Sequence, residues 1–103
     1  MEIVSFEIAK KLKEKGYPQV IDKYADFYPD GVGELVAPTI SQVLKWLREE
    51  KKIYVSVEVE REDWFEYKIV QTIKNTRKTG TRVYETYSEA ILAGIEYVLD
   101  NLI

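Results

Sequence analysis

Two neighbouring stretches of alternating residues constrain the fold of this chain more than any other feature. Apolar and polar side chains alternate from Ile53 to Glu60 and again from Trp64 to Lys74. A period of two is typical of a β-strand that buries one face. The polar turn Arg61-Glu62-Asp63 is all that separates the two stretches. We therefore predict an antiparallel hairpin, because such a short connection joins adjacent antiparallel strands.

The alternation also predicts which side chains of this hairpin face the core. The side expected to be buried consists of Ile53, Val55, Val57 and Val59 with Phe65, Tyr67, Ile69 and Ile73. The opposite, outer face carries Tyr54 and Trp64. Residues 75–80 are predicted to form a polar loop, and Arg82 to Glu85 a third strand, which places Tyr84 on or near the outer face as well.

The N-terminal third begins with the signals of one helix. Ser5 is placed to cap a helix from Phe6 to Lys15, and Gly16 is placed to end it in the left-handed conformation. Residues 17–37 that follow are too apolar for a solvated linker, and Pro29-Asp30-Gly31-Val32-Gly33 predicts a turn. We expect a loose hairpin or an irregular arm that packs on the body of the protein.

Two further helices are predicted from paired capping residues. Thr39 with Gln42, and Thr86 with Glu89, have the spacing of a capping box. The second helix is expected from Pro38-Thr39 to about Lys52, and the third from Thr86 to the C-terminus. Gly94 lies on the apolar side of the third helix, where we expect it to allow a close approach to the sheet. The residues predicted to be core are Leu44, Leu47, Val55, Val57, Ile69, Ile95 and Leu99.

The fold class predicted from these elements is α+β. We expect an antiparallel three-stranded sheet with helices packed on one face, in the order helix, arm, helix, strand, strand, strand, helix. The N-terminal arm either extends this sheet as a hairpin or covers its outer face. Residues 1–103 are enough for one domain and too few for two, so we predict a single domain.

The composition excludes several kinds of chemistry. The chain has neither cysteine nor histidine, which excludes disulfides, thiolate chemistry, imidazole metal ligation and Ser-His or Cys-His catalysis. Acidic residues could be proposed as a carboxylate dyad or a magnesium site, in the pairs Glu58/Glu60, Glu62/Asp63 and Asp26/Asp30. Nothing in the sequence supplies a third converging ligand, so a solvated face is the favoured interpretation. We predict no enzyme activity, no cofactor and no metal.

The start of the chain and its hydropathy predict a location. Met1-Glu2-Ile3-Val4 has no basic region followed by an apolar stretch, so it does not read as a signal peptide. No apolar run approaches the length of a membrane span. A cytoplasmic protein that does not contact a membrane is expected.

Three stretches resemble a family of small proteins found in the genomes of gut anaerobes and of their phages or mobile elements. They are Ser5-Phe6-Glu7 through Lys15-Gly16-Tyr17, then Ala37-Pro38-Thr39 running into Lys45-Trp46-Leu47-Arg48-Glu49, and Thr86-Tyr87-Ser88-Glu89-Ala90 through the C-terminus. Together they span most of the chain. The resemblance implies a small α+β protein of phage or mobile-element origin, and it brings no catalytic residues and no function to transfer.

The order helix, three strands, helix also resembles the double-stranded RNA-binding domain, in topology alone. That domain needs a lysine-rich start to its last helix, which meets phosphates across the groove. Here that start is Thr86-Tyr87-Ser88-Glu89-Ala90, which is acidic. The sequence therefore disfavours this interpretation.

Charge and exposed aromatic residues define two candidate binding surfaces. Residues 64–82 carry five basic residues against one acidic residue, and residues 83–103 carry four acidic residues and no basic one. These two segments could neutralise each other in the fold. The candidate basic surface is Lys74, Arg77, Lys78 and Arg82, and the candidate aromatic surface is Tyr54, Trp64 and Tyr84.

Two functions remain open for these surfaces. The favoured prediction is a non-enzymatic protein–protein interaction module, acting through an unidentified protein partner or through self-association. The alternative is a weak nucleic-acid-binding domain that uses the basic loop 74–82 and the outer-face aromatic residues. Against both stands the interpretation of a solvated hairpin tip, with an outer face covered by residues 17–37.

Overall fold

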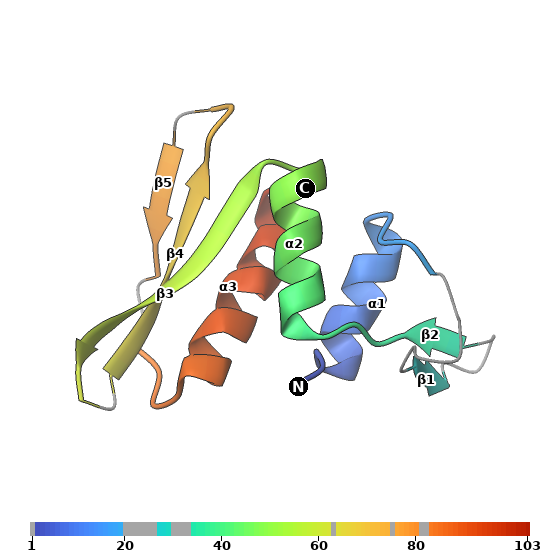
Figure 1. Cartoon of the computed structure of the whole chain (residues 1–103), viewed down its shortest axis with the longest axis horizontal. Coiled ribbons are helices and arrows are strands. Elements are labelled where there is room, and N and C mark those ends of the chain that lie inside the picture. Colours follow the sequence, from blue (N-terminus) through green and yellow to red (C-terminus); the bar gives the residue numbers. More distant parts are fainter. Residues whose placement is uncertain (1, 20–26, 30–33, 63, 75, 81–82) are drawn as a thin grey trace.

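The computed structural model describes residues 2–19, 27–29, 34–62, 64–74, 76–80 and 83–103. These residues form three helices and five strands (Figure 1). In chain order they are α1 (Phe6–Glu14), β1 (Phe27–Pro29), β2 (Glu34–Val36), α2 (Ile40–Glu50), β3 (Ile53–Arg61), β4 (Trp64–Gln71), β5 (Thr76–Thr79) and α3 (Tyr87–Asn101).

The elements are arranged in layers, with the three helices on one side of an antiparallel sheet (Figure 1). The sheet has the order β3-β4-β5, and α3 packs across its inner face. Helix α2 runs directly into β3, and α1 packs against α3 on the side away from the sheet. The predicted α+β class and the order of the elements are confirmed.

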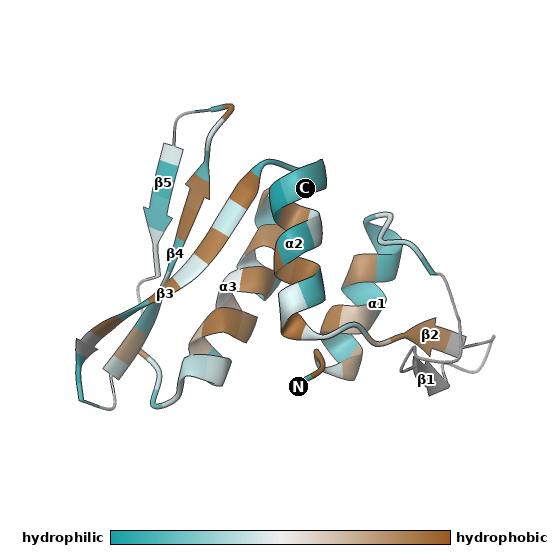
Figure 2. Ribbon diagram, in the orientation of Figure 1, coloured by the Kyte–Doolittle hydropathy of each residue, from teal (hydrophilic) through white to brown (hydrophobic). Residues whose placement is uncertain are grey.

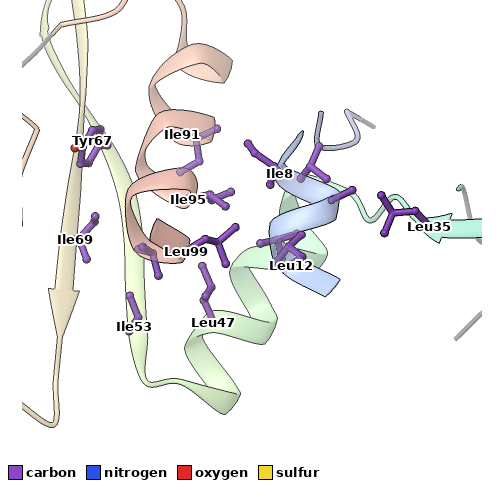
Figure 3. Close-up of a cluster of buried hydrophobic side chains, with 14 residues drawn as sticks. Ile8, Leu12, Leu35, Leu47, Ile53, Tyr67, Ile69, Ile91, Ile95 and Leu99 are labelled. Atoms are coloured by element: carbon purple, nitrogen blue, oxygen red, sulfur yellow. The ribbon is translucent and has the colours of Figure 1, made fainter. Parts of the chain in front are cut away.

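The predicted inward orientation of Val55, Val57, Tyr67 and Ile69 in the hairpin is confirmed. Val55 lies opposite Ile69, and Val57 lies opposite Tyr67. The two patterns meet on the inner face, and Figure 2 shows the alternation along β3 as bands of different hydropathy. Figure 3 shows the core that results, where side chains of the sheet and all three helices point toward one another. Of the predicted core residues, Leu47, Ile69, Ile95 and Leu99 are buried, and Leu44, Val55 and Val57 pack half-buried against them.

Two residues predicted to be buried are exposed instead. Val59 is 64% exposed and Ile73 is 79% exposed. Val59 lies near the β3–β4 turn, which extends away from the helices in Figure 1 and carries an irregularity between Val59 and Arg61. Ile73 lies in a turn, because β4 ends at Gln71 and not at Lys74.

The third strand also differs from the prediction. It is β5, within the segment 75–80 predicted as a loop, whereas Tyr84 forms an isolated bridge with Phe65 and Arg82 lies outside the described residues. All four β5 side chains are exposed. An edge strand needs only backbone hydrogen bonds to its neighbour, so apolar alternation gave no signal of it.

The helix ends follow the predicted capping. The Ser5 hydroxyl accepts a hydrogen bond from the Ile8 N–H, and Gly16 has a φ of +93°. Thr39 and Gln42 form a complete capping box. The Thr86 hydroxyl accepts from the Glu89 N–H in the same way.

The N-terminal arm contains the predicted hairpin, in which β1 and β2 pair antiparallel. It is a separate two-stranded sheet beside α1, with Leu35 buried in the core. The expected extension of the main sheet by this hairpin was therefore wrong, and the described part of the arm does not cover the outer face of the sheet. The Asp30–Gly33 part of the predicted turn lies outside the described residues.

Two of the four acidic residues in the segment 83–103 form ion pairs with α1. Glu96 and Asp100 of α3 both bind the Lys11 ammonium of α1, at 2.9 and 3.1 Å. These hydrogen bonds, that to Glu96 first, raise the pKa of Lys11. These two carboxylates of α3 are thus paired with α1, whereas Lys78 of the basic segment contacts α3 at the Tyr97 ring.

Candidate interaction surface

The outer face of the sheet is open in the described part of the molecule. We define the outer face as the side chains that β3, β4 and β5 direct away from the helices: Tyr54, Ser56, Glu58, Trp64, Glu66, Lys68, Val70, Arg77 and Thr79. Every described helix lies on the other side (Figure 1). Tyr54 is 43% exposed and Trp64 is 44% exposed. A large aromatic side chain at such exposure leaves apolar surface for another molecule to cover.

One end of the outer face is a row across three strands. Tyr54 lies opposite Val70, and Val70 lies opposite Arg77. Directly opposite side chains in antiparallel strands are close neighbours. This row therefore combines an aromatic ring, an aliphatic side chain and a guanidinium group.

The other end of the outer face is a stacked pair. The guanidinium carbon of Arg61 lies 4.2 Å from the centroid of the Trp64 ring. Such a cation–π contact restrains both side chains. Trp64 and Val70 are separated along β4 by about 20 Å at the usual rise of a strand. The two aromatic ends are therefore separate and do not form one contiguous apolar patch.

The middle of the outer face is polar and mixed in charge. Glu58 lies opposite Glu66, and the Lys68 ammonium binds the Glu58 carboxylate at 2.6 Å. Like charges directly opposite each other are unfavourable, and Lys68 offsets this repulsion. The face is consequently not a positively charged groove.

The structure places two of the three predicted aromatic residues on this face, at its opposite ends, and the third on the helix side. Tyr54 and Trp64 are exposed as expected. Tyr84 pairs with Phe65, whose side chain points to the helix side, and Tyr84 packs half-buried against the core. The assignment of Tyr84 to the outer face was therefore wrong.

The three predicted basic residues that the structure describes, Lys74, Arg77 and Lys78, are exposed, but they do not form one cluster. Lys74 lies in the turn before β5, Arg77 points to the outer face, and Lys78 points to the helix side. The Lys78 ammonium lies 5.4 Å from the centroid of the Tyr97 ring of α3. Arg82 lies outside the described residues. Because neighbouring side chains of a strand point to opposite faces, β5 separates Arg77 from Lys78.

Two tyrosines that pack in or against the core have raised pKa values. Burial raises the pKa of Tyr67, and Tyr84 and Tyr97 nearby raise it further. Burial likewise raises the pKa of Tyr17, which packs edge-on against Trp46. A raised pKa keeps a phenol neutral, so neither side chain is activated as a nucleophile or base.

The carboxylate pairs considered from the sequence are only partly described. Glu58 is bound to Lys68, Glu62 is exposed, and the Glu60 side chain, Asp26, Asp30 and Asp63 lie outside what the structure describes. In the described ranges, no three His, Cys, Asp or Glu side chains gather where they could hold a metal ion. No helix there is long and apolar enough to cross a membrane.

Sequence reasoning missed the partners of the exposed aromatic residues. Val70 and Arg61 complete the two ends of the outer face, and neither was a candidate. The signal was available in the hairpin itself, because a known turn fixes which residues lie opposite each other. The position of Arg77 could not be derived in this way, since β5 had not been recognised as a strand.

Comparison with protein-family models, curated proteins and solved structures found no match for this chain. The resemblance to small proteins of gut anaerobes and their mobile elements stays a prediction.

Proposed function

We propose that this chain is a cytoplasmic, non-enzymatic protein-interaction module that binds a protein partner on the outer face of its sheet. The observation that carries the proposal is that no described segment covers the outer face, which has an exposed aromatic residue at each end. Trp, Tyr and Arg are the residues that most often contribute large parts of a binding energy. Here Trp64 is held against Arg61, and Tyr54 lies in a row with Val70 and Arg77.

The size of the face limits the strength of this interaction. The nine residues of β3 span about 30 Å, and three strands make the face about 15 Å wide. The product is at most about 450 Å², whereas a standard interface buries about 800 Å² on each partner. The outer face alone supports a weak, transient complex, and a tighter one needs contacts beyond it.

Nucleic-acid binding is the second candidate, because separated aromatic rings on a sheet can stack bases of a single strand. Against it stand Glu58 and Glu66 in the middle of the face, and the divergence of Arg77 and Lys78. We expect non-specific affinity no better than about 100 μM at physiological salt.

The test compares capture of partners from cells that make this protein, with and without nuclease. The tagged wild type is compared with a Tyr54→Ala/Trp64→Ala double variant. Tyr87→Ala is the matched control, since Tyr87 is 52% exposed on α3 and lies off the outer face. We expect a nuclease-resistant protein partner that is retained by the control and reduced about tenfold or more in the double variant. Equal capture by all three proteins would refute the proposal, and loss on nuclease treatment would favour nucleic acid.

A further inference from the structure

Strand β5 forms the outer edge of the sheet, and no described segment lies beyond it (Figure 1). Its backbone directions follow from two sets of backbone contacts with β4. The Gly80 N–H donates to the Tyr67 carbonyl at 2.9 Å, and Tyr84 and Phe65 exchange both of their backbone hydrogen bonds. In an antiparallel ladder, the N–H and C=O of one residue point to the same side, and successive residues alternate. Thr76 and Lys78 therefore bond to β4, whereas Arg77 and Thr79 direct their N–H and C=O groups outward.

The side chains around this edge are cationic on both faces. Arg77 points to the outer face, Lys78 to the helix side, and Lys74 lies in the preceding turn. Ile73 in the same turn is 79% exposed. Basic side chains on an edge strand disfavour pairing with an identical edge, because the cations of two copies would meet. The same charges attract an acidic strand.

We propose that β5 accepts an extended acidic segment of a partner protein as a fourth strand of the sheet. This inference rests on the proposed function and adds to it the chemistry of the partner. Arg77 and Thr79 each offer one donor and one acceptor, so a peptide backbone can form up to four hydrogen bonds with them. Acidic residues placed opposite Arg77 and Lys78 would meet a cation on each face.

The pattern of donors and acceptors favours a peptide over a nucleic acid. Phosphate oxygens accept hydrogen bonds but do not donate, so they could satisfy the outward N–H groups of Arg77 and Thr79 and not their carbonyls. An added strand also continues the outer face beyond β5, which increases the contact area available to a partner.

The free protein already allows one test of the backbone directions. In hydrogen exchange followed by NMR, the amides of Arg77 and Thr79 should exchange fast, and those of Thr76 and Lys78 more slowly. The probe for binding is the acetylated peptide Thr-Val-Glu-Asp-Val-Thr, amidated at its C-terminus. We expect it to slow exchange at Arg77 and Thr79 about tenfold at saturation. The counterpart with two lysines in place of Glu-Asp should leave both rates unchanged.

Two variants separate the backbone contribution from that of charge. Thr79→Pro removes an outward N–H without removing a bond to β4, and proline is tolerated on edge strands at such positions. Thr79→Ala is its matched control, because it keeps the N–H. We expect the dissociation constant to rise about fivefold in Thr79→Pro and to change less than about twofold in Thr79→Ala. The Arg77→Glu/Lys78→Glu variant should raise it more than about tenfold.

Specific outcomes would overturn the inference. Equal affinity of the Thr79→Pro and Thr79→Ala variants would show that the peptide does not pair with the edge. Absence of peptide binding, or protection by single-stranded oligothymidylate that Thr79→Pro leaves intact, would also refute it. If the Tyr54→Ala/Trp64→Ala variant still binds the peptide but no longer captures the partner, the edge and the outer face are two separate binding sites. If capture through the outer face persists and no acidic peptide binds, the edge proposal fails alone.

Discussion

Replacing Gly94 with alanine tests how closely α3 approaches the sheet. Gly94 is buried in the middle of the helix, where a glycine costs about 1 kcal/mol relative to alanine. Helix propensity alone therefore predicts that Gly94→Ala stabilises the protein by about 1 kcal/mol. The added methyl group, however, would lie 2.8 Å from Val55 Cγ1 and 3.0 Å from Tyr67 Cβ.

The size of that clash decides whether Gly94→Ala stabilises or destabilises the protein. Carbon atoms pack without strain at about 3.5–4.0 Å, so the methyl group forces a shift of about 0.7 Å or more. Neither neighbour can yield easily, because Val55 is β-branched and the Tyr67 Cβ is attached to the backbone of the central strand. Overpacking of this kind costs about 1–3 kcal/mol. We expect the cost to exceed the gain in propensity and Gly94→Ala to destabilise the fold by about 1 kcal/mol.

Urea unfolding followed by circular dichroism measures this change. A double-mutant cycle with Val55→Ala identifies its cause, because Val55→Ala removes the closest atom. In the Val55→Ala background we expect Gly94→Ala to destabilise the protein by at most half as much as in the wild type, which is a coupling free energy of about 0.5 kcal/mol or more. If Gly94→Ala instead stabilises the otherwise wild-type protein by about 1 kcal/mol, α3 does not need the glycine to reach the sheet.

Three further predictions concern capping, alkaline pH and catalysis. Thr39→Ala breaks the capping box of α2 and should cost about 1 kcal/mol in urea unfolding, whereas Thr76→Ala, on the exposed edge strand, should cost less than about 0.5 kcal/mol. Because the pKa of Tyr67 is raised in the folded protein, the unfolded chain loses this phenolic proton first. The stability should therefore be constant below about pH 10 and fall as the pH rises through the raised pKa. The melting temperature should fall less steeply across this range for Tyr67→Phe. The purified protein should show no hydrolase, phosphatase or nuclease turnover with or without magnesium, and turnover abolished by Glu58→Gln would contradict the absence of catalysis.

The parts of the fold that could be predicted are those in which side-chain chemistry carries the structural signal. Alternating apolar residues marked β3 and most of β4, because each strand buries one face against α3. Thr39 and Gln42 marked the start of α2, because a helix N-terminus has unpaired N–H groups that their side chains satisfy. In each case the residue type is fixed by a local physical requirement, which a single sequence displays.

It could not be predicted that the described part of the arm leaves the outer face open, because the sequence shows how much apolar surface the arm must bury and not where it does so. Residues 17–37 were expected to satisfy this requirement on the sheet. The described part of the arm satisfies it at the other end of the molecule, where Leu35 joins the core beside α1. Tyr54 and Trp64 remain exposed as a consequence.

Tyr67 explains why the edge strand was missed as well. Gly94 of α3 lies close to the Tyr67 Cβ, and a Cβ added to Gly80 would lie 2.8 Å from the Tyr67 ring. The sequence indicated the first contact, since a glycine on a helix stripe is unusual, and gave no indication of the second, since glycine is common in loops. Yet it is the Gly80 backbone that bonds to Tyr67 and continues the register of β5. Backbone contacts with the central strand β4 therefore position the edge to which the proposed partner strand would bind. The exposed side chains of Arg77 and Lys78 then determine only which partner that edge can accept.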